Sequence, residues 1–555
     1  MGDLPVADRP RVAVVGGGIA GLGAAWELTG GAAGPGPGTP SVVVLEADRR
    51  CGGKLATAEF SGEPVDVGPD GFLGRRPEAE ALCRELGLGA RLVPVGASGA
   101  AVWARGRPRP LPDGLALGIP TRVLPVAGSG ILSPSGTARL ALDLVAPRPD
   151  TRGPLGDRAI GPLLVHKLGH QVVERLVDPM LGGIHAGGLG DASAAALLPD
   201  LLTAAQGRSS LMRALRNDAR ARDHESHHRR RETRPTPLSW LPWRTGVRHV
   251  EGTDEVDAGS DGRQPSEEAA GNAGPPLFWA LEGGLESLAT ALVAQLGSRG
   301  VVVRTSSPVS ALERRGGRWV LRSATGGDDA EEFDAVILAL PAGPAAELLV
   351  PHDTDASGML RATDYASVAV VTLSYADDDV PDDLYGTGLL VPRETVLPRG
   401  ATAVADADAR APRRRRETCL VTACTYLSCK WPHLARPGER LLRASVGRYG
   451  DERFAELCDD DLVDRVTLEL GALLGTTGAP HAALVTRWPE ALPQYRVHHL
   501  LRVGAVESAV KRLGGLAVAG AAYHGVGIPA CVASGRRAAR DVLAQLEGVG
   551  QRAPA

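Results

Sequence analysis

The stretch of residues 11–21, RVAVVGGGIAG, decides the fold of this chain. Its apolar run Val12–Val15 leads directly into the pattern Gly16-x-Gly18-x-x-Gly21. The following residues to Leu28 have helical spacing, and a second apolar run, SVVVL at 41–45, is closed by an acid. This order predicts a strand, a glycine turn, a helix and a second strand, which is the arrangement of a dinucleotide-binding βαβ unit.

Each part of this unit has a physical reason to bind a dinucleotide. The glycines permit a tight turn and let the backbone approach a pyrophosphate closely. The helix start offers free N–H groups and the positive end of a dipole. Glu46 can accept hydrogen bonds from both ribose hydroxyls. The spacing from Gly16 to Glu46 exceeds the usual ~20 residues, and the Gly/Pro-rich loop at 29–40 accounts for the excess. A glycine turn selected only for packing is the alternative.

Composition excludes several classes of protein. The chain has 555 residues, 43% hydrophobic and 23% charged, which is typical of a globular protein with several structural units. A net charge of −4 gives no concentrated basic face, so we expect no nucleic-acid partner. Seven scattered cysteines without a CxxC pair argue against a disulfide scaffold, and we expect no metal site. The chain starts without a secretory signal and has no apolar stretch of about 18 residues, so we expect a cytoplasmic protein.

A second glycine segment separates FAD from NAD. Residues 46–54, EADRRCGGK, resemble the E-A-x-x-R-x-G-G-x pattern of the amine-oxidase superfamily of flavoenzymes. In that superfamily the arginine and the two glycines pass close to the FAD pyrophosphate and ribityl chain. The corresponding residues here are Arg50, Gly52 and Gly53. An NAD-dependent dehydrogenase, which is an alternative, has no reason to carry this segment.

Three later stretches resemble the soluble bacterial type of protoporphyrinogen/coproporphyrinogen III oxidase. Residues 67–73, VGPDGFL, are similar to G-P-D-S-F-L, with Gly71 in place of serine. Residues 487–495, RWPEALPQY, are similar to R-W…M-P-Q-Y, and residues 520–531, GAAYHGVGIPAC, to G-A-x-x-x-G-V-G-I-P-D-C. Weaker likenesses occur at 118–121, 181–187 and 422–433. The resemblance covers nearly the whole chain except about 216–275.

The resemblance implies an FAD enzyme of haem biosynthesis. We expect a six-electron, oxygen-dependent oxidation of coproporphyrinogen III to coproporphyrin III, with hydrogen peroxide as the second product. The porphyrinogen and molecular oxygen are the expected partners. Alternatives are a protoporphyrinogen IX oxidase, an amine oxidase or carotenoid desaturase on the same fold, and a flavin-binding protein without catalytic activity. Peripheral membrane contact and transient contact with the next haem-pathway enzyme stay open.

The expected fold class is α/β. We expect a Rossmann-like FAD-binding domain assembled from discontinuous segments, a mixed-sheet substrate domain and a mainly helical domain. Helical spacing is clearest at 159–176 and 194–215, and a further helix is expected at 459–474. Apolar content collapses at about 216–275. The expected units are FAD-binding segments at 11–85, 277–345 and 511–547, a helical or substrate-lid region at 86–215, a disordered insertion at 216–276 and a substrate-binding domain at 346–510.

The expected site residues follow from the motifs and the resemblance. Pro529 suits the first turn of a helix, so a second helix start is expected at Ile528, with N–H groups that face the flavin. Arg76 is the expected partner of a substrate propionate, and no catalytic residue is identified. His185 is expected to pack in the core. The residues expected to bind FAD are Gly16, Gly17, Gly18, Ile19, Ala20, Gly21, Glu46, Ala47, Arg50, Gly52, Gly53, Lys54, Gly68, Pro69, Asp70, Gly71, Val309, Trp488, Gly520, Val526, Gly527 and Ile528.

Overall fold

The fold is described from a computed structural model. It describes residues 9–146, 156–206, 210–218, 220, 276–324, 330–397 and 418–550. The insertion expected at 216–276 lies outside the described residues except for 216–218, 220 and 276.

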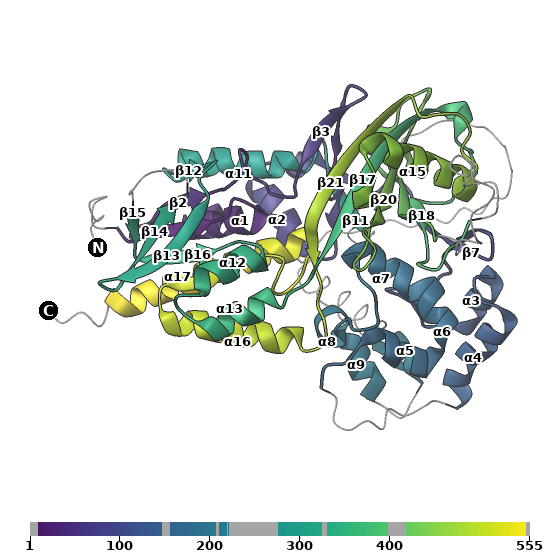
Figure 1. The fold of residues 1–555 in the computed structure, drawn as a ribbon, viewed down its shortest axis with the longest axis horizontal. Helices are drawn as coiled ribbons and strands as arrows, with labels where there is room; N and C mark the ends of the chain where they lie inside the picture. Colours follow the sequence, from purple (N-terminus) through teal and green to yellow (C-terminus); the bar gives the residue numbers. More distant parts are fainter. Residues whose placement is uncertain are drawn as a thin grey trace, which may run out of the picture.

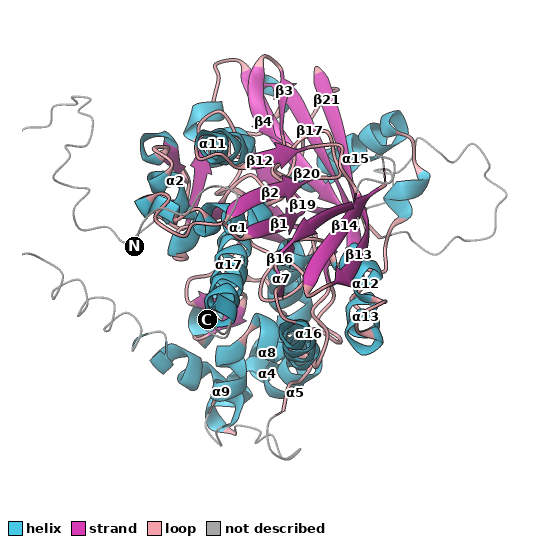
Figure 2. Ribbon diagram, turned by 90° about the vertical axis from the view of Figure 1, so that its left-hand side faces the viewer, coloured by secondary structure: helices cyan, strands magenta, loops and turns pink. Residues whose placement is uncertain are grey.

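A parallel sheet forms the layer that carries the glycine turn (Figure 2). Its described strands pair in the order β12-β2-β1-β16-β22, all in the same direction, so their carboxyl ends share one edge. The sequence prediction of two strands around the glycine turn is confirmed to the residue. The strands are β1 (Arg11–Val15), β2 (Ser41–Leu45), β12 (Val302–Arg304), β16 (Ala335–Leu338) and β22 (Leu516–Val518).

Alternate residues of these strands enter two different cores, as strand geometry requires. Val12 and Val14 pack with helices on one face, whereas Ala13 and Val15 pack on the other. The first face is covered by α1 (Ile19–Leu28), α2 (Pro77–Glu85), α11 (Glu286–Ser298) and α17 (Ile528–Gly550). The second is covered by α12 (Ala342–Leu349), α13 (Thr354–Arg361), α16 (His499–Leu513) and a sheet of β13 (Val309–Arg315), β14 (Arg318–Ser323) and β15 (Ala330–Phe333).

A mixed sheet lies beside this layer (Figure 1). Its described strands pair in the order β21-β17-β20-β19-β18-β7-β8, antiparallel except for the parallel pair β18 and β7. Helix α15 (Asp459–Leu474), predicted with the same bounds, packs in its core. The strands are β7 (Ala101–Ala104), β8 (Arg107–Pro110), β17 (Tyr365–Ala376), β18 (Gly388–Leu390), β19 (Val421–Tyr426), β20 (Glu439–Val446) and β21 (Ala482–Pro493).

The helical part of the chain lies below the mixed sheet in Figure 1 and has its own core. Two helices that the sequence predicts as continuous are broken. Gly169, at φ 98°, ends the first, and the second restarts at Pro199. The helices are α3 (Val123–Ser129), α4 (Pro134–Val145), α5 (Ile160–Leu168), α6 (His170–Val172), α7 (Asp178–His185), α8 (Ala194–Leu197) and α9 (Pro199–Gln206).

The expectation of mostly helical structure from about 85 to 215 is wrong for its first third. Residues 92–120 contain short strands. Some of them pair with segments far away in the sequence and others with neighbouring strands. These pairings leave no local periodicity that sequence alone could detect. The short strands outside the large sheets are β3 (Thr57–Phe60), β4 (Glu63–Asp66), β5 (Phe72–Leu73), β6 (Leu92–Pro94), β9 (Leu115–Ala116), β10 (Ile119–Pro120) and β11 (Phe278–Leu281).

The α/β fold class is thus confirmed. Among the described helices, none combines the length and the apolar character needed to cross a membrane.

Candidate active site

The glycine turn between β1 and α1 combines two tightly packed glycines with an open one. A Cβ on Gly16 would lie 2.4 Å from the Ala339 carbonyl oxygen, and one on Gly21 only 1.9 Å from the Gly16 carbonyl oxygen. Packing therefore demands glycine at both positions. At Gly18 the backbone is extended, at φ −69°, and a Cβ would meet no atom within 4 Å. Space in front of the helix start is therefore open at Gly18.

The segment after β2 lies against this turn. Glu46 accepts hydrogen bonds from Gly17 N–H at 2.5 Å and from Asp48 N–H at 2.8 Å. Gly52 N–H donates to the Gly17 carbonyl at 2.8 Å. Arg50 donates to the Gly53 and Leu55 carbonyls at 2.8 and 2.9 Å, and so holds this loop in shape. Two glycine backbones, from the turn and from the loop, are thus fixed side by side.

Lys54 extends the same loop toward the far end of the sheet. Its side chain is exposed, yet the surrounding protein still lowers its pKa by desolvation, while Cys531 and Glu490 act in the opposite direction. Cys531 lies in the first turn of α17, so the Lys54 ammonium is near the second helix start.

That second helix start follows β22 at the same edge of the sheet. Gly520 N–H donates to Ser534 Oγ at 3.1 Å, and Gly527, just before the helix, is exposed. Helix α17 packs closely on α1, because a Cβ on Gly535 would stand 1.9 Å from the Ala20 carbonyl oxygen. The strands that lead to α1 and α17 are parallel, so both helix N-termini lie at the edge where a pyrophosphate and a flavin ring would be expected.

The segment 67–71 joins the mixed sheet to this edge. A Cβ on Gly68 would lie 1.9 Å from the Lys54 carbonyl oxygen, so the two backbones touch. Trp488 Nε1 donates to the Val67 carbonyl at 2.9 Å, and Arg443 donates to that of Gly68. Three motifs that are far apart in sequence, at 46–54, 67–71 and 487–488, are therefore adjacent in space.

Asp70 is part of a largely buried ion cluster. It accepts hydrogen bonds from Lys430 Nζ at 2.8 Å and Trp431 Nε1 at 3.1 Å, and Arg443 Nη1 lies 3.9 Å away. Burial opposes its ionisation, but the charges of Lys430 and Arg443 hold its pKa well below the ordinary range. The next residue, Gly71, packs against the same tryptophan, and a Cβ there would lie 2.8 Å from the Trp431 ring. This contact explains why the serine of the resembling motif is absent.

For a neighbouring acid, Asp66, the protein shifts the pKa in the opposite direction, upward. Its Oδ1 accepts from Thr57 Oγ1 at 2.7 Å and from Leu285 N–H at 2.8 Å, and burial raises its pKa to about 6. In the folded protein Asp66 keeps its proton up to about pH 6, whereas the unfolded chain loses it near 3.8. This group therefore makes stability fall as pH rises from about 4 to 6.

We expect Asp66→Asn to stabilise the protein above pH 6. The asparagine carbonyl keeps both hydrogen bonds and removes the cost of ionisation, on the order of 2–3 kcal/mol. Chemical denaturation at pH 4.5 and pH 8 measures the effect, which should be large only at pH 8. Thr57→Val, which removes one of the two donors, is the control and should destabilise at both pH values. A destabilised Asp66→Asn protein at pH 8 would contradict the prediction.

Three further residues that were expected in the site lie in different surroundings. Val309 opens β13, and the preceding loop approaches the turn through Ser307 N–H, which donates to the Glu46 carbonyl at 2.8 Å. Arg76 is exposed and its Nη2 lies 3.3 Å from Glu78 Oε1, so an acid already neighbours it. Pro69 is half-buried between Gly68 and Asp70.

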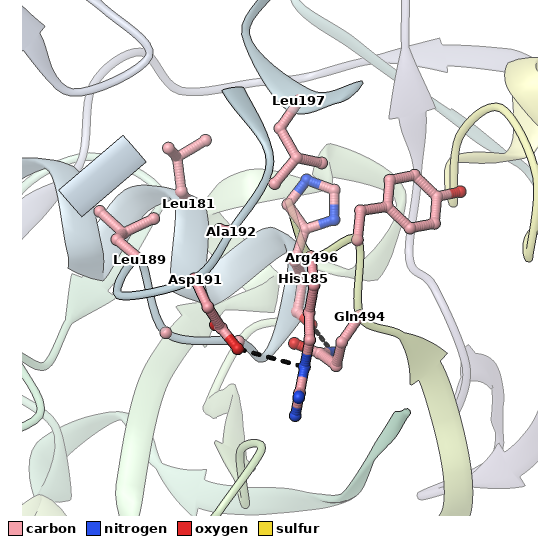
Figure 3. Close-up of a pocket in the computed structure, with 11 residues that line it drawn as sticks. Leu181, His185, Leu189, Asp191, Ala192, Leu197, Gln494 and Arg496 are labelled. Carbon is pink, nitrogen blue, oxygen red and sulfur yellow. Dashed lines mark hydrogen bonds and ion pairs between the residues drawn. The ribbon is translucent and has the colours of Figure 1, made fainter. Parts of the chain in front are cut away.

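A small cavity lies between the helical part and the end of β21 (Figure 3). His185 lines it and is half-buried, and desolvation by the surrounding protein lowers its pKa to about 4, so the ring is neutral at pH 7. Gln494 Nε2 donates to the His185 carbonyl at 2.9 Å, and Arg496 Nε lies 3.1 Å from Asp191 Oδ2. The cavity volume is about 20 Å³, enough for one water molecule.

Tyr495, beside this cavity, connects it to the second helix start. Its ring stacks on His499 at 3.9 Å between centroids, and its hydroxyl donates to the Ala521 carbonyl. His499 Nε2 lies 2.8 Å from the Tyr523 carbonyl oxygen. Sequence analysis noted the Gln494-Tyr495 pair within a motif but assigned it no role. Lys430 and Arg443 were also missed, because only folding brings them to Asp70.

Comparison with known proteins identifies the family. The sequence matches the family described as flavin-containing amine oxidoreductase over residues 19–543. The chain belongs to this family. FAD is therefore its cofactor, and the chain is an oxidoreductase. The open space at Gly18, the exposed Lys54 ammonium and the two helix N-termini fit an FAD with its pyrophosphate at α1.

Curated relatives match this chain over nearly its full length. A protein of Bacillus subtilis (strain 168) named coproporphyrinogen III oxidase is 29% identical over 97% of this chain and 99% of its own. A protein of Propionibacterium freudenreichii with the same name is 34% identical over 97% of this chain and 92% of its own. A crystal structure from Exiguobacterium sp. 255-15, described as a candidate protoporphyrinogen oxidase, is 29% identical with a TM-score of 0.73 and covers 97% of this chain and 99% of that one.

We expect Gly18→Ala to separate cofactor contact from folding. A Cβ at position 18 meets no protein atom, so the apoprotein should lose less than about 1 kcal/mol. The same Cβ would occupy the space in front of α1, so FAD affinity should fall at least about 10-fold, which corresponds to about 1.4 kcal/mol. Apoprotein unfolding and FAD titration measure the two effects.

Gly343→Ala is the matched control for this prediction, because a Cβ there also meets no atom within 4 Å. It should change neither quantity. Unchanged FAD affinity in Gly18→Ala would show that the pyrophosphate does not lie against this turn.

Proposed function

We propose that this protein oxidises coproporphyrinogen III to coproporphyrin III. The observation that carries the proposal is full-length similarity to proteins named coproporphyrinogen III oxidase, at 29% and 34% identity. Protoporphyrinogen IX is the second candidate substrate, because a Bos taurus protein named protoporphyrinogen oxidase is 28% identical over 96% of this chain.

The proposed reaction removes six electrons and six protons from the macrocycle. Three molecules of oxygen each accept two electrons and two protons, so three molecules of hydrogen peroxide form. Bound FAD supplies the capacity to accept two electrons at a time. This chain must then hold the macrocycle, orient it and stabilise charge at the cofactor.

The chain's own groups support these tasks in three ways. The α1 N-terminus and the glycine turn offer N–H groups to the pyrophosphate. The α17 N-terminus, with Lys54 nearby, offers positive potential where negative charge develops. The Asp70 cluster anchors the 67–71 segment to the mixed sheet and so keeps Gly68 against Lys54.

We also propose roles for the parts of the chain. The parallel sheet with its helices forms the FAD-binding unit, from the segments 11–85, 277–345 and 511–547. The mixed sheet, largely from 346–510, and the helical part at 86–215 enclose the substrate. The motif residues that converge at the carboxyl edge of the parallel sheet are the proposed FAD contacts. Arg76 is the proposed contact for a substrate propionate.

The test is turnover of both porphyrinogens by the purified holoenzyme. Each is prepared anaerobically and then mixed with enzyme in air, with porphyrin fluorescence and hydrogen peroxide measured together. Three peroxides per coproporphyrin III, formed faster than with the FAD-depleted protein, is the expected result. Faster turnover of protoporphyrinogen IX would support the second candidate. Rates equal to autoxidation for both, with FAD bound, would overturn the proposal.

A further inference from the structure

Two arginines stand close together where the mixed sheet meets the helical part. Arg393 follows β18 by three residues, and Arg448 follows β20 after Gly447. Asp178, the first residue of α7, interacts electrostatically with both. The three residues thus come from three separate elements that only the fold brings together.

Within the described part of the chain, neither arginine has a charged partner at bonding distance. Arg448 is only 8% exposed, and Arg393 is half-buried. Among the described residues, neither guanidinium makes a hydrogen bond, and neither has a carboxylate within the 4.0 Å limit of an ion pair. No nitrogen of Arg448 is among the fully enclosed, unpaired side-chain nitrogens of the described residues. The neighbouring Arg453 differs, since it grips Asp451 at 2.7 and 2.8 Å.

The two arginines also interact with each other electrostatically. Burial lowers the pKa of Arg448, and the like charge of Arg393 lowers it further. Burial raises the pKa of Asp178, although both arginines and a hydrogen bond from Leu189 N–H favour its ionised form. Asp451 also favours the charged form of Arg448, but it is bonded to Arg453. Among the described residues, neither Asp178 nor Asp451 forms an ion pair with Arg393 or Arg448, so both guanidiniums keep N–H donors for a carboxylate ligand.

The pair lies directly behind the segment that lines the His185 cavity. Arg393 Nη2 is 3.4 Å from the place of a Cβ on Gly188, and Tyr449 N–H donates to the Ala186 carbonyl at 2.6 Å. Gln494, on the other side of the segment, donates to the His185 carbonyl and precedes Tyr495, whose hydroxyl reaches Ala521 before α17. A continuous series of contacts thus links the arginine pair with the helix start that faces the cofactor.

We propose that Arg393 and Arg448 bind a carboxylate of the substrate. The proposal rests on the proposed function, because coproporphyrinogen III carries four propionates and a macrocycle held near α17 must place some of them away from the cofactor. The planar fork of arginine can bind a carboxylate through two parallel hydrogen bonds, and two adjacent forks can share its oxygens. Arg393 and Arg448 are therefore binding residues that position the macrocycle.

The test compares coproporphyrin III with its tetramethyl ester, in the same detergent buffer, as ligands of the FAD-loaded enzyme. Fluorescence quenching gives the dissociation constants, and turnover of coproporphyrinogen III gives KM and kcat. Arg393→Gln should weaken binding of the acid about 10- to 100-fold, as expected for loss of charged hydrogen bonds, and raise KM with kcat little changed. Ester binding and FAD content should not change. Arg448→Lys, which keeps the charge but loses the fork, should give an intermediate effect.

Arg453→Gln is the matched control, because it removes a nearby charge that Asp451 already neutralises. It should leave the affinity for the acid within about 2-fold, since a satisfied pair near the surface contributes little. Unchanged acid binding in Arg393→Gln, or equal loss for acid and ester, would overturn the carboxylate site. Wild-type protein that neither binds coproporphyrin III nor oxidises the porphyrinogen would instead overturn the proposed function, and with it this assignment of the occupant.

Discussion

Gly21→Ala should yield protein that retains no FAD. The added Cβ would stand 1.9 Å from the Gly16 carbonyl oxygen, far inside contact distance, and this oxygen belongs to rigid backbone. The turn must then move away from α1, which displaces the N–H groups that we propose to bind the pyrophosphate. We expect FAD affinity to fall more than about 100-fold, which is roughly 3 kcal/mol, and stability to fall by about 1–3 kcal/mol from overpacking. The flavin absorbance of purified protein and thermal unfolding measure both.

Gly23→Ala supplies the control in the same helix. Its Cβ would meet Val532 at 3.7 Å, an ordinary contact, and alanine favours a helix interior by roughly 0.5–1 kcal/mol over glycine. This variant should keep its FAD and unfold at the same or a higher temperature. Normal flavin content in Gly21→Ala would show that the tight turn is not required for cofactor binding.

Asp70→Ala should be the most destabilising exchange in the mixed-sheet junction. It leaves Lys430 and Arg443 without their shared acid, and their side chains are only 14% and 9% exposed. Removing one partner of such a pair costs roughly 3 kcal/mol, because a poorly solvated charge remains. Urea denaturation at pH 7 measures the loss. FAD content should fall too, since the 67–71 segment loses its anchor.

The pH dependence of this loss has a defined sign. The folded pKa of Asp70 lies well below the unfolded value of 3.8, so its contribution is fully present above about pH 4 and declines as pH falls below that. The difference between wild type and Asp70→Ala should therefore shrink in acid. Asp382→Ala, which removes a 90% exposed partner of Arg440, should change stability by less than about 1 kcal/mol. A pH-independent difference for Asp70→Ala would contradict the ionic explanation.

Local signals were sufficient for the elements that carry the cofactor motifs. The bounds of β1, β2 and α15 follow from apolar runs and flanking glycines or acids, and the structure confirms them. The turn at Gly16 and Gly21 was predictable because a close backbone approach there excludes side chains. The glycine at 71 was recognised only as a departure from a motif, since its cause is a contact with Trp431.

Long-range partnerships could not be predicted. The strands at 92–120 pair across the chain, so no local periodicity marks them. In an arginine-rich chain, Arg393 and Arg448 look like any others. Among the described residues, neither arginine is bonded to an acid. This feature can be recognised only in the folded structure, which brings the two arginines together.

The order in which the parallel sheet is assembled has a consequence for synthesis of the protein. Its central strand, β1, pairs with β16, which pairs with β22, so the sheet joins Arg11 to a strand that begins at Leu516. Translation at about 5–20 residues per second separates these two by roughly 25–100 s. The nascent chain therefore cannot complete its nucleotide site while most of it is still being made. With FAD placed as proposed, its complete site forms only after β22 and α17 have been translated, and we expect a truncation before them to yield a chain that does not retain FAD.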